Sequence, residues 1–184
     1  MTPTWSTACL DWADRLKQGK SLIPAPIFPD EAERGLVVMR ELRIVDAPGS
    51  PTIGEACAPW VFDLAASIFG AYEAESGRRL ITEWFVCLPK KNSKSTIAAA
   101  IMLTSLILNW RQSAEFIILA PTVEIANNSY APSRDMCGND DELDELLSYH
   151  PAHHAGWHQL CVLQRTRCRV PGRDDLQHPG SETL

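Results

Sequence analysis

The fold is decided by residues Trp84–Trp110, which read W-F-V-C-L-P-K-K-N-S-K-S-T-I-A-A-A-I-M-L-T-S-L-I-L-N-W. A short apolar run, Trp84–Leu88, is followed by a polar basic turn, Pro89–Lys94, and then by a long apolar segment that begins at Ser95. The first part predicts a strand. The last part predicts a helix, because it is rich in alanine and contains neither proline nor glycine. The stretch therefore predicts a strand, a loop and a helix in succession.

This order of elements suits phosphate binding. A loop that leads into a helix directs free backbone N–H groups and the positive end of the helix dipole towards one point. Lys94 would add a point charge for the terminal phosphates of a nucleotide, and the Ser95 hydroxyl would bind Mg²⁺, as in G-x-x-x-x-G-K-[ST]. The two glycine positions of that pattern are Leu88 and Ser93 here. The alternative is a basic turn capped by Ser93 or Ser95.

The composition is that of an ordinary globular domain. The chain has 184 residues, of which 45% are hydrophobic and 22% are charged, and this length suits one domain. The formal net charge of −6 excludes the overall basic character that is typical of many nucleic-acid-binding proteins. Any contact with nucleic acid would therefore be local, or made by another part of an assembly.

We expect a cytoplasmic protein that does not contact a membrane. The six cysteines show no C-x-x-C spacing. No secretory signal opens the chain, because Asp11, Asp14 and Arg15 lie where its apolar region would be. The longest apolar stretch, Ile97–Leu108, is too short to span a bilayer.

The sequence divides into three regions. Residues 1–39 are expected to form an N-terminal arm, residues 40–136 a partial domain and residues 137–184 an irregular tail. The arm carries apolar residues at near-helical spacing and then a proline-rich exit, which predicts a short helix. These apolar residues would pack onto the domain or, alternatively, form a docking surface; they are Trp5, Leu10, Trp12 and Leu16. Residues 31–46 fit either a strand or a helix.

The tail differs in character from the rest of the chain. It holds all five histidines and no lysine, and it begins with an acidic, helix-like cluster at Asp140–Glu145. Only Leu160–Leu163 resembles a strand. A metal site is one interpretation, but no spacing matches a zinc pattern; the candidate ligands are His150, His153, His154, His158, Cys161 and Cys168. The abrupt change favours a disordered segment, or one that is read in an altered frame.

Two helices are predicted on either side of the central stretch. Pro59–Gly70 has an apolar stripe, with Pro59 in the first turn and Gly70 as the C-cap. Val123–Met136 would begin after Thr122 as N-cap, and Pro132 would end or kink it.

Two strands are predicted in the central region, at Leu80–Leu88 and Phe116–Ala120. The second is a continuous apolar run that is typical of a buried parallel strand. Together with the helix that begins at Ser95, they would make a right-handed βαβ unit. The predicted fold class is therefore α/β, with a partial parallel sheet of the P-loop type that is flanked by helices.

Three blocks together resemble the start of the ATPase domain of phage terminase large subunits, the motors that package double-stranded DNA into capsids. The blocks are P-W-V-F-D-L-A-A-S-I-F-G, W-F-V-C-L-P-K-K-N-S-K-S-T-I-A-A-A and F-I-I-L-A-P-T-V-E-I-A-N-N-S-Y. They lie within about residues 40–136, in the family's order and spacing. The resemblance implies ATP and Mg²⁺ as cofactors. The implied partners are viral double-stranded DNA, a portal protein, a small terminase subunit and further copies in a ring.

The resemblance also assigns roles to residues. The family's phosphate loop is often a basic residue or two followed by Asn-Gly-Lys-Ser, and Ser93 stands here in place of the glycine. The aromatic segment near the adenine would be Trp60 and Phe62, although the family's glutamine is replaced by Val61. The other implied nucleotide-binding residues are Lys90, Lys91, Asn92, Lys94, Ser95 and Thr96. The hydroxyl of Ser95 would also bind Mg²⁺.

The acidic residues that ATP hydrolysis needs do not follow the loop. Phosphoryl transfer to water requires a metal-binding carboxylate and a second carboxylate, usually Asp-Glu after an apolar strand. Asp144-Glu145 lies in the acidic run instead, and the family's later nuclease domain is missing as well. We expect a truncated terminase fragment that binds ATP weakly and does not hydrolyse it. The alternatives are a fragment of another P-loop or helicase-like ATPase, or a non-catalytic prophage remnant.

Overall fold

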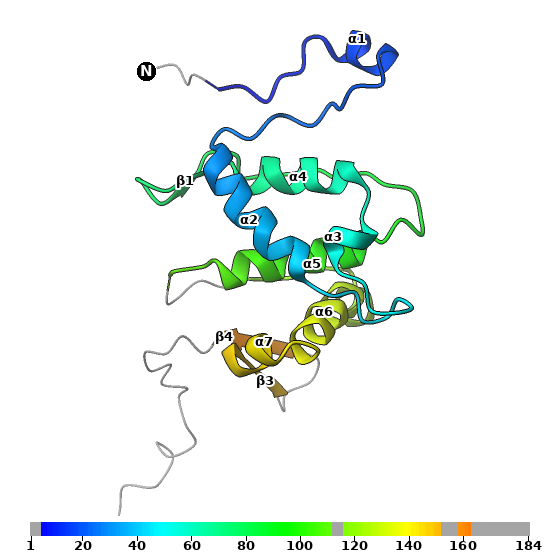
Figure 1. Ribbon diagram of the computed structural model, residues 1–184, viewed down its shortest axis with the longest axis vertical. Coiled ribbons are helices and arrows are strands. Elements are labelled where there is room, and N and C mark those ends of the chain that lie inside the picture. Colours follow the sequence, from blue (N-terminus) through cyan, green and yellow to red (C-terminus); the bar gives the residue numbers. More distant parts are fainter. Residues whose placement is uncertain (1–4, 112–115, 152–157, 163–184) are drawn as a thin grey trace, which may run out of the picture.

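A computed structural model describes residues 5–111, 116–151 and 158–162 (Figure 1). Helices predominate, and the strands form two small antiparallel sheets. The helices are α1 (Trp12–Lys17), α2 (Pro29–Glu41), α3 (Ile53–Ala56), α4 (Pro59–Phe69), α5 (Lys94–Ile107), α6 (Val123–Gly138) and α7 (Asp141–Leu146). The strands are β1 (Tyr72–Glu73), β2 (Arg78–Arg79), β3 (Leu147–Pro151) and β4 (His158–Val162). The chain is thus a mixed, helix-rich fold.

The segment that fits either a strand or a helix forms α2. Pro29 stands at the start of this helix, where its fixed φ suits helical backbone and its missing N–H costs nothing. The buried residues repeat at helical spacing, and they are Ala32, Gly35, Leu36 and Met39. This stripe packs against α3, α4 and α5.

The helix predicted at Pro59–Gly70 is confirmed as α4. Pro59 occupies the first turn and Gly70 is the C-cap residue, as expected. The short α3 that precedes it begins with a capping box. The Glu55 backbone N–H donates to Thr52 Oγ1 over 3.2 Å, and the Thr52 N–H donates to Glu55 Oε2 over 2.9 Å. Two N–H groups that would otherwise lack partners are satisfied in this way.

A close contact between α2 and α4 depends on Gly35. A Cβ atom on this residue would lie 2.3 Å from Cγ and 2.4 Å from Cδ2 of Phe69. Both residues are buried. The phenyl ring of Phe69 therefore takes the space of the missing side chain, and the two helices approach each other closely.

The helix predicted after the basic turn is confirmed as α5. We expected it to be buried against a sheet, but it packs against α2 and α6, because helices cover it in place of the expected strands. Its inward face carries Ile97, Ala100 and Leu103, which join the central cluster of buried residues. That cluster also contains Leu36, Met39, Leu42, Ile53, Val61, Ala65, Phe69, Met136 and Cys137.

The two predicted strands of the parallel sheet are not formed within the described residues. Leu80–Leu88 and Phe116–Ala120 carry no strand pairing, and every ladder of the described sheets is antiparallel. Phe85 is 93% exposed and Leu119 is 90% exposed. A buried parallel strand needs neighbouring strands and helices on both faces. Without these neighbours the two segments lie open to solvent.

The hairpin β1–β2 was not predicted from the sequence. It pairs Tyr72 with Arg79, and its turn contains Gly77 with a φ of +66°, which glycine adopts at little cost. The residues after α5 hold this hairpin in place. Trp110 Nε1 donates to the Tyr72 hydroxyl over 2.8 Å, and Arg111 Nη2 donates to the Gly77 carbonyl over 2.6 Å.

The helix predicted after Thr122 is confirmed as α6, but it continues past Pro132 to Gly138. Of the two effects predicted for Pro132, an end of the helix or a kink, the first is therefore wrong. Thr122 Oγ1 accepts the Ile125 N–H over 3.3 Å, as an N-cap does. Near the helix end, burial raises the pKa of the Cys137 thiol to about 12, with a smaller contribution from neighbouring carboxylates. This thiol is consequently a packing group rather than a nucleophile.

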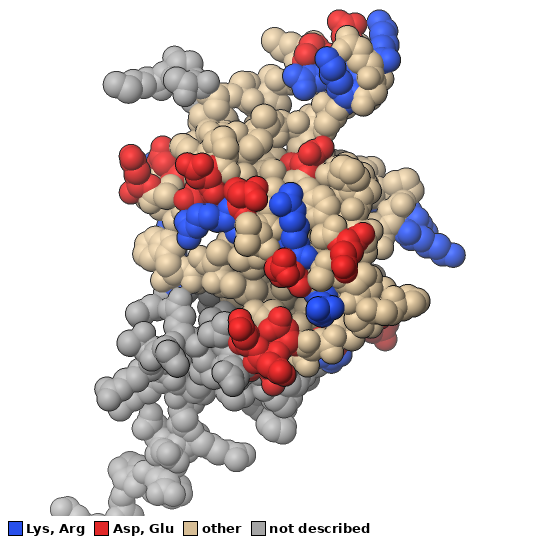
Figure 2. Space-filling model, viewed as in Figure 1, with Lys and Arg blue, Asp and Glu red and all other residues tan. Residues whose placement is uncertain are grey.

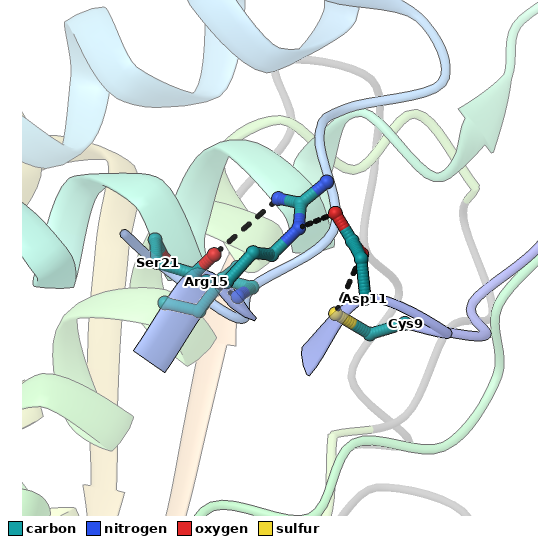
Figure 3. Close-up of polar contacts among 5 residues, drawn as sticks. Cys9, Asp11, Arg15 and Ser21 are labelled. Atoms are coloured by element: carbon teal, nitrogen blue, oxygen red, sulfur yellow. Dashed lines mark hydrogen bonds and ion pairs between the residues drawn. The ribbon is translucent and has the colours of Figure 1, made fainter. Parts of the chain in front are cut away.

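The first part of the expected arm, with α1, lies apart from the other helices (Figure 1), whereas residues 29–39 belong to α2 and pack in the core. Leu10, Trp12 and Leu16 are 93%, 56% and 55% exposed, so these residues do not pack onto the domain as expected. The arm is ordered locally instead (Figure 3). Arg15 Nε donates to Asp11 Oδ2 over 2.9 Å, and this bond lowers the pKa of the Asp11 carboxyl.

The acidic cluster at the start of the tail forms α7, as predicted. It leads into the antiparallel hairpin β3–β4, of which only the second strand was expected. The metal-site interpretation involves His153, His154 and Cys168, which lie outside the described residues. Among the residues that the structure describes, none of the helices has the length and apolar character needed to cross a bilayer.

Candidate functional site

The loop Pro89–Ser93 leads directly into the first turn of α5. Its backbone turns sharply, since Lys91 and Ser93 adopt φ values of +65° and +49°. The Asn92 side-chain Nδ2 donates to the Pro89 carbonyl over 3.3 Å and closes the loop. The first backbone hydrogen bond of the helix runs from the Ile97 N–H to the Ser93 carbonyl over 2.9 Å. The N–H groups before Ile97 come too early in the helix to have intrahelical partners.

Lys94 folds back over this loop. Its Nζ donates to the Pro89 carbonyl over 2.7 Å and to the Leu88 carbonyl over 3.2 Å. Both bonds span the loop, so they fix the ammonium group beside the start of α5. Lys90 and Lys91 are exposed on the same short loop. The loop and the first residue of α5 thus carry three lysines, and the positive end of the helix dipole favours an anion beside them.

Ser93 stands at the position where the phosphate-loop pattern has its second glycine. Its φ of +49° and ψ of +30° place it in the left-handed region, and its side chain makes no capping hydrogen bond. The backbone conformation is thus one that glycine favours, adopted here by a serine. Such a conformation costs a residue with a Cβ atom about 1–2 kcal/mol.

We expect Ser93→Gly to raise the free energy of unfolding by about 1 kcal/mol, because glycine adopts the left-handed conformation without the Cβ penalty. Ser95→Gly is a matched control. Ser95 lies in the first turn of α5, where glycine is a weaker helix former, so this change should lower stability by up to about 1 kcal/mol. Urea denaturation of both variants measures the two effects. Losses of similar size in both would show that the loop conformation is not as described.

The donor set at the start of α5 fits a magnesium–phosphate ligand. Ser95 and Thr96 are half-buried hydroxyl residues in the first turn. A serine hydroxyl is an oxygen ligand of the hard kind that Mg²⁺ accepts beside substrate phosphates. Within the described residues no group of three or more His, Cys, Asp and Glu side chains forms a metal centre.

Trp60 and Phe62 lie on α4, where both are half-buried and pack against the central cluster. The Arg40 guanidinium lies over the Phe62 ring, 5.2 Å from its centroid. Packing within the domain accounts for both aromatic side chains. The structure thus brings the residues of the loop together at the start of α5, but it gives these aromatics a role in the core.

A cavity of about 230 Å³ adjoins the first turn of α5. Thr96 lines it on one side, and residues 44–46 and the middle of α6 form the remainder. The polar residues around it are Asp46, Asn127, Asn128 and Asp135. None of these residues was predicted from the sequence, because Asp46 and the asparagines are about 80 positions apart and share no motif. The sequence contains one indication of the cavity, because Asn127 and Asn128 are adjacent poor helix formers within a predicted helix.

The surface charge does not by itself indicate a nucleic-acid interface. On the face drawn in Figure 2, basic side chains alternate with acidic ones and do not merge into one patch. The formal net charge of the chain is −6. Phosphate neutralisation along a duplex needs clustered lysines and arginines.

No protein-family model, curated protein or solved structure matches the chain.

Proposed function

We propose that Pro89–Thr96 binds the phosphates of Mg-ATP. The observation that carries this proposal is the arrangement of Lys94, whose ammonium group is held on the Leu88 and Pro89 carbonyls beside the first turn of α5. Phosphate oxygens would replace these carbonyls as acceptors, with little movement of the side chain. A phosphate would form the stronger bonds, because the ammonium group would then pair with an anion and not with a neutral carbonyl oxygen.

We further propose that the chain represents the beginning of the ATPase motor of a phage terminase large subunit. The support is the resemblance of the three blocks, together with the loop that leads into α5. In this proposal Leu80–Leu88 and Phe116–Ala120 become neighbouring strands of a parallel sheet. Burial in a sheet would remove the exposed apolar side chains of Phe85, Ile117 and Leu119 from water.

The parent activity would be ATP-driven packaging of viral double-stranded DNA in the cytoplasm of the bacterial host. An acidic chain with interspersed surface charges is a poor DNA-binding unit by itself. We therefore place the DNA contacts in a ring of several copies. The portal protein and the small terminase subunit would be further partners of that assembly.

Titration of the chain with Mg-ATP tests the phosphate site. We expect saturable binding that weakens when Mg²⁺ is chelated, because the metal neutralises part of the triphosphate charge and carries the contact to Ser95. We expect no release of phosphate over the same period, because no Asp-Glu pair follows an apolar strand. Absence of saturable binding would contradict the proposed site, and phosphate release would contradict the proposed lack of catalytic carboxylates.

A further inference from the structure

The cavity adjoins the first turn of α5, the turn that follows the proposed phosphate loop. Thr96 lines this cavity and comes two residues after Lys94 on the same helix. Two residues correspond to about 3 Å along a helix axis. We propose that the cavity binds the nucleoside part of the nucleotide, its base and ribose. This inference rests on the proposed phosphate site.

The lining of the cavity suits a purine or pyrimidine base. Val45, Ala131 and Pro132 supply apolar surface for the faces of a flat ring. The side-chain amides of Asn127 and Asn128 offer donors and acceptors, which is the combination that a base edge requires. Both asparagines are exposed, so neither amide is committed to the packing of the domain.

The proline within α6 adds a backbone acceptor to the cavity. Pro132 has no N–H, so the Asn128 carbonyl, four residues earlier, lacks its usual helical donor. Both residues line the cavity. A proline inside a helix costs about 3 kcal/mol relative to alanine. The carbonyl that it leaves free can accept a hydrogen bond from an exocyclic amine or a ribose hydroxyl, which gives Pro132 a function at the site.

Charge sets the direction in which a nucleotide would lie. Asp46 lines the cavity together with Asp135, whose carboxylate pairs with Arg134 over 2.6 Å, whereas Lys94 and the neighbouring lysines belong to the loop and its junction with α5. Carboxylates repel phosphates but accept hydrogen bonds from ribose hydroxyls and amines. The triphosphate therefore lies towards the loop and the uncharged nucleoside towards α6.

Comparison of Mg-ATP with Mg-tripolyphosphate tests the nucleoside site separately from the phosphate site. We expect Asn128→Ala to weaken Mg-ATP binding about 2- to 10-fold, the equivalent of one lost hydrogen bond, and to leave tripolyphosphate binding unchanged. Asn139→Ala is the matched control, because Asn139 is an exposed C-cap residue of α6 outside the cavity. It should change neither affinity.

A second variant excludes loss of folding as the cause. Pro132→Ala restores a helical N–H, so it should stabilise the chain while weakening Mg-ATP binding and sparing tripolyphosphate. Equal affinities of Asn128→Ala, Pro132→Ala and the parent chain for Mg-ATP would overturn the nucleoside site and leave the phosphate site standing. If tripolyphosphate does not bind, or if Lys94→Ala leaves its affinity unchanged, the phosphate site is overturned and the nucleoside site with it.

Discussion

The substitution Gly35→Val is expected to lower the free energy of unfolding by about 3 kcal/mol, at the upper end of the usual cost of overpacking. A Cβ atom at this position would lie 2.3–2.7 Å from three atoms of Phe69. Those atoms include the Cβ of Phe69, which cannot move without the backbone of α4. The two helices would therefore have to separate, and the cluster that contains Leu36 and Phe69 would lose contacts.

Two further variants show whether this contact is the cause. Gly138→Val should change stability by less than about 0.5 kcal/mol, because a Cβ on Gly138 meets nothing within 4 Å. In the pair Gly35→Ala and Phe69→Ala, the loss of Cγ and Cδ2 from residue 69 should relieve most of the clash. The double variant should then be more stable than the sum of the single effects predicts, by about 0.5–3 kcal/mol. Urea denaturation measures all of these values; strict additivity would argue against the contact.

The helices could largely be predicted from the sequence because their signals are local. Pro59 and Gly70 mark the ends of α4, and Thr122 marks the start of α6. Pro132 does not end α6, which was one of the two effects expected of it, because tertiary packing of α6 against α5 outweighs the loss of one helical hydrogen bond. The choice between strand and helix for α2 was open, although its buried residues repeat at helical spacing.

The strands could not be predicted with the same success, because strand pairing depends on distant segments. Leu80–Leu88 and Phe116–Ala120 have the composition of buried strands, yet composition does not supply a neighbouring strand. The hairpin β1–β2 has strands of two residues each, and such strands are too short for an alternation of apolar and polar residues to be recognised. Contacts from Trp110 and Arg111, more than thirty residues away, hold it in place.

The candidate site could likewise be predicted only in part. The loop Pro89–Thr96 is contiguous, so its lysines and hydroxyls could be identified from their order. The left-handed backbone of Ser93 also follows from the motif, which has a glycine there. The cavity residues could not be identified, because Asp46 and Asn128 meet only when α6 packs beside the segment after α2. The exposed apolar residues of the arm were misassigned, since helical spacing does not show whether a partner surface exists.

Lys94→Ala is expected to weaken Mg-ATP binding by roughly 10- to 150-fold. The variant loses hydrogen bonds between an ammonium group and phosphate oxygens, and bonds to charged groups contribute about 1.5–3 kcal/mol each. Lys94 is an exposed side chain whose hydrogen bonds are to the Leu88 and Pro89 carbonyls. Its removal should therefore leave the packing of α5 intact, and an unchanged far-UV circular dichroism spectrum would confirm this.

Lys20→Ala provides the matched control, because Lys20 is an exposed lysine on the N-terminal arm, outside the phosphate loop. The decisive measurement is the dissociation constant of Mg-ATP for the parent chain, Lys94→Ala and Lys20→Ala at one ionic strength. A phosphate-binding loop predicts a loss of at least about tenfold for Lys94→Ala and no change for Lys20→Ala. Equal losses in the two variants, or none in either, would contradict it.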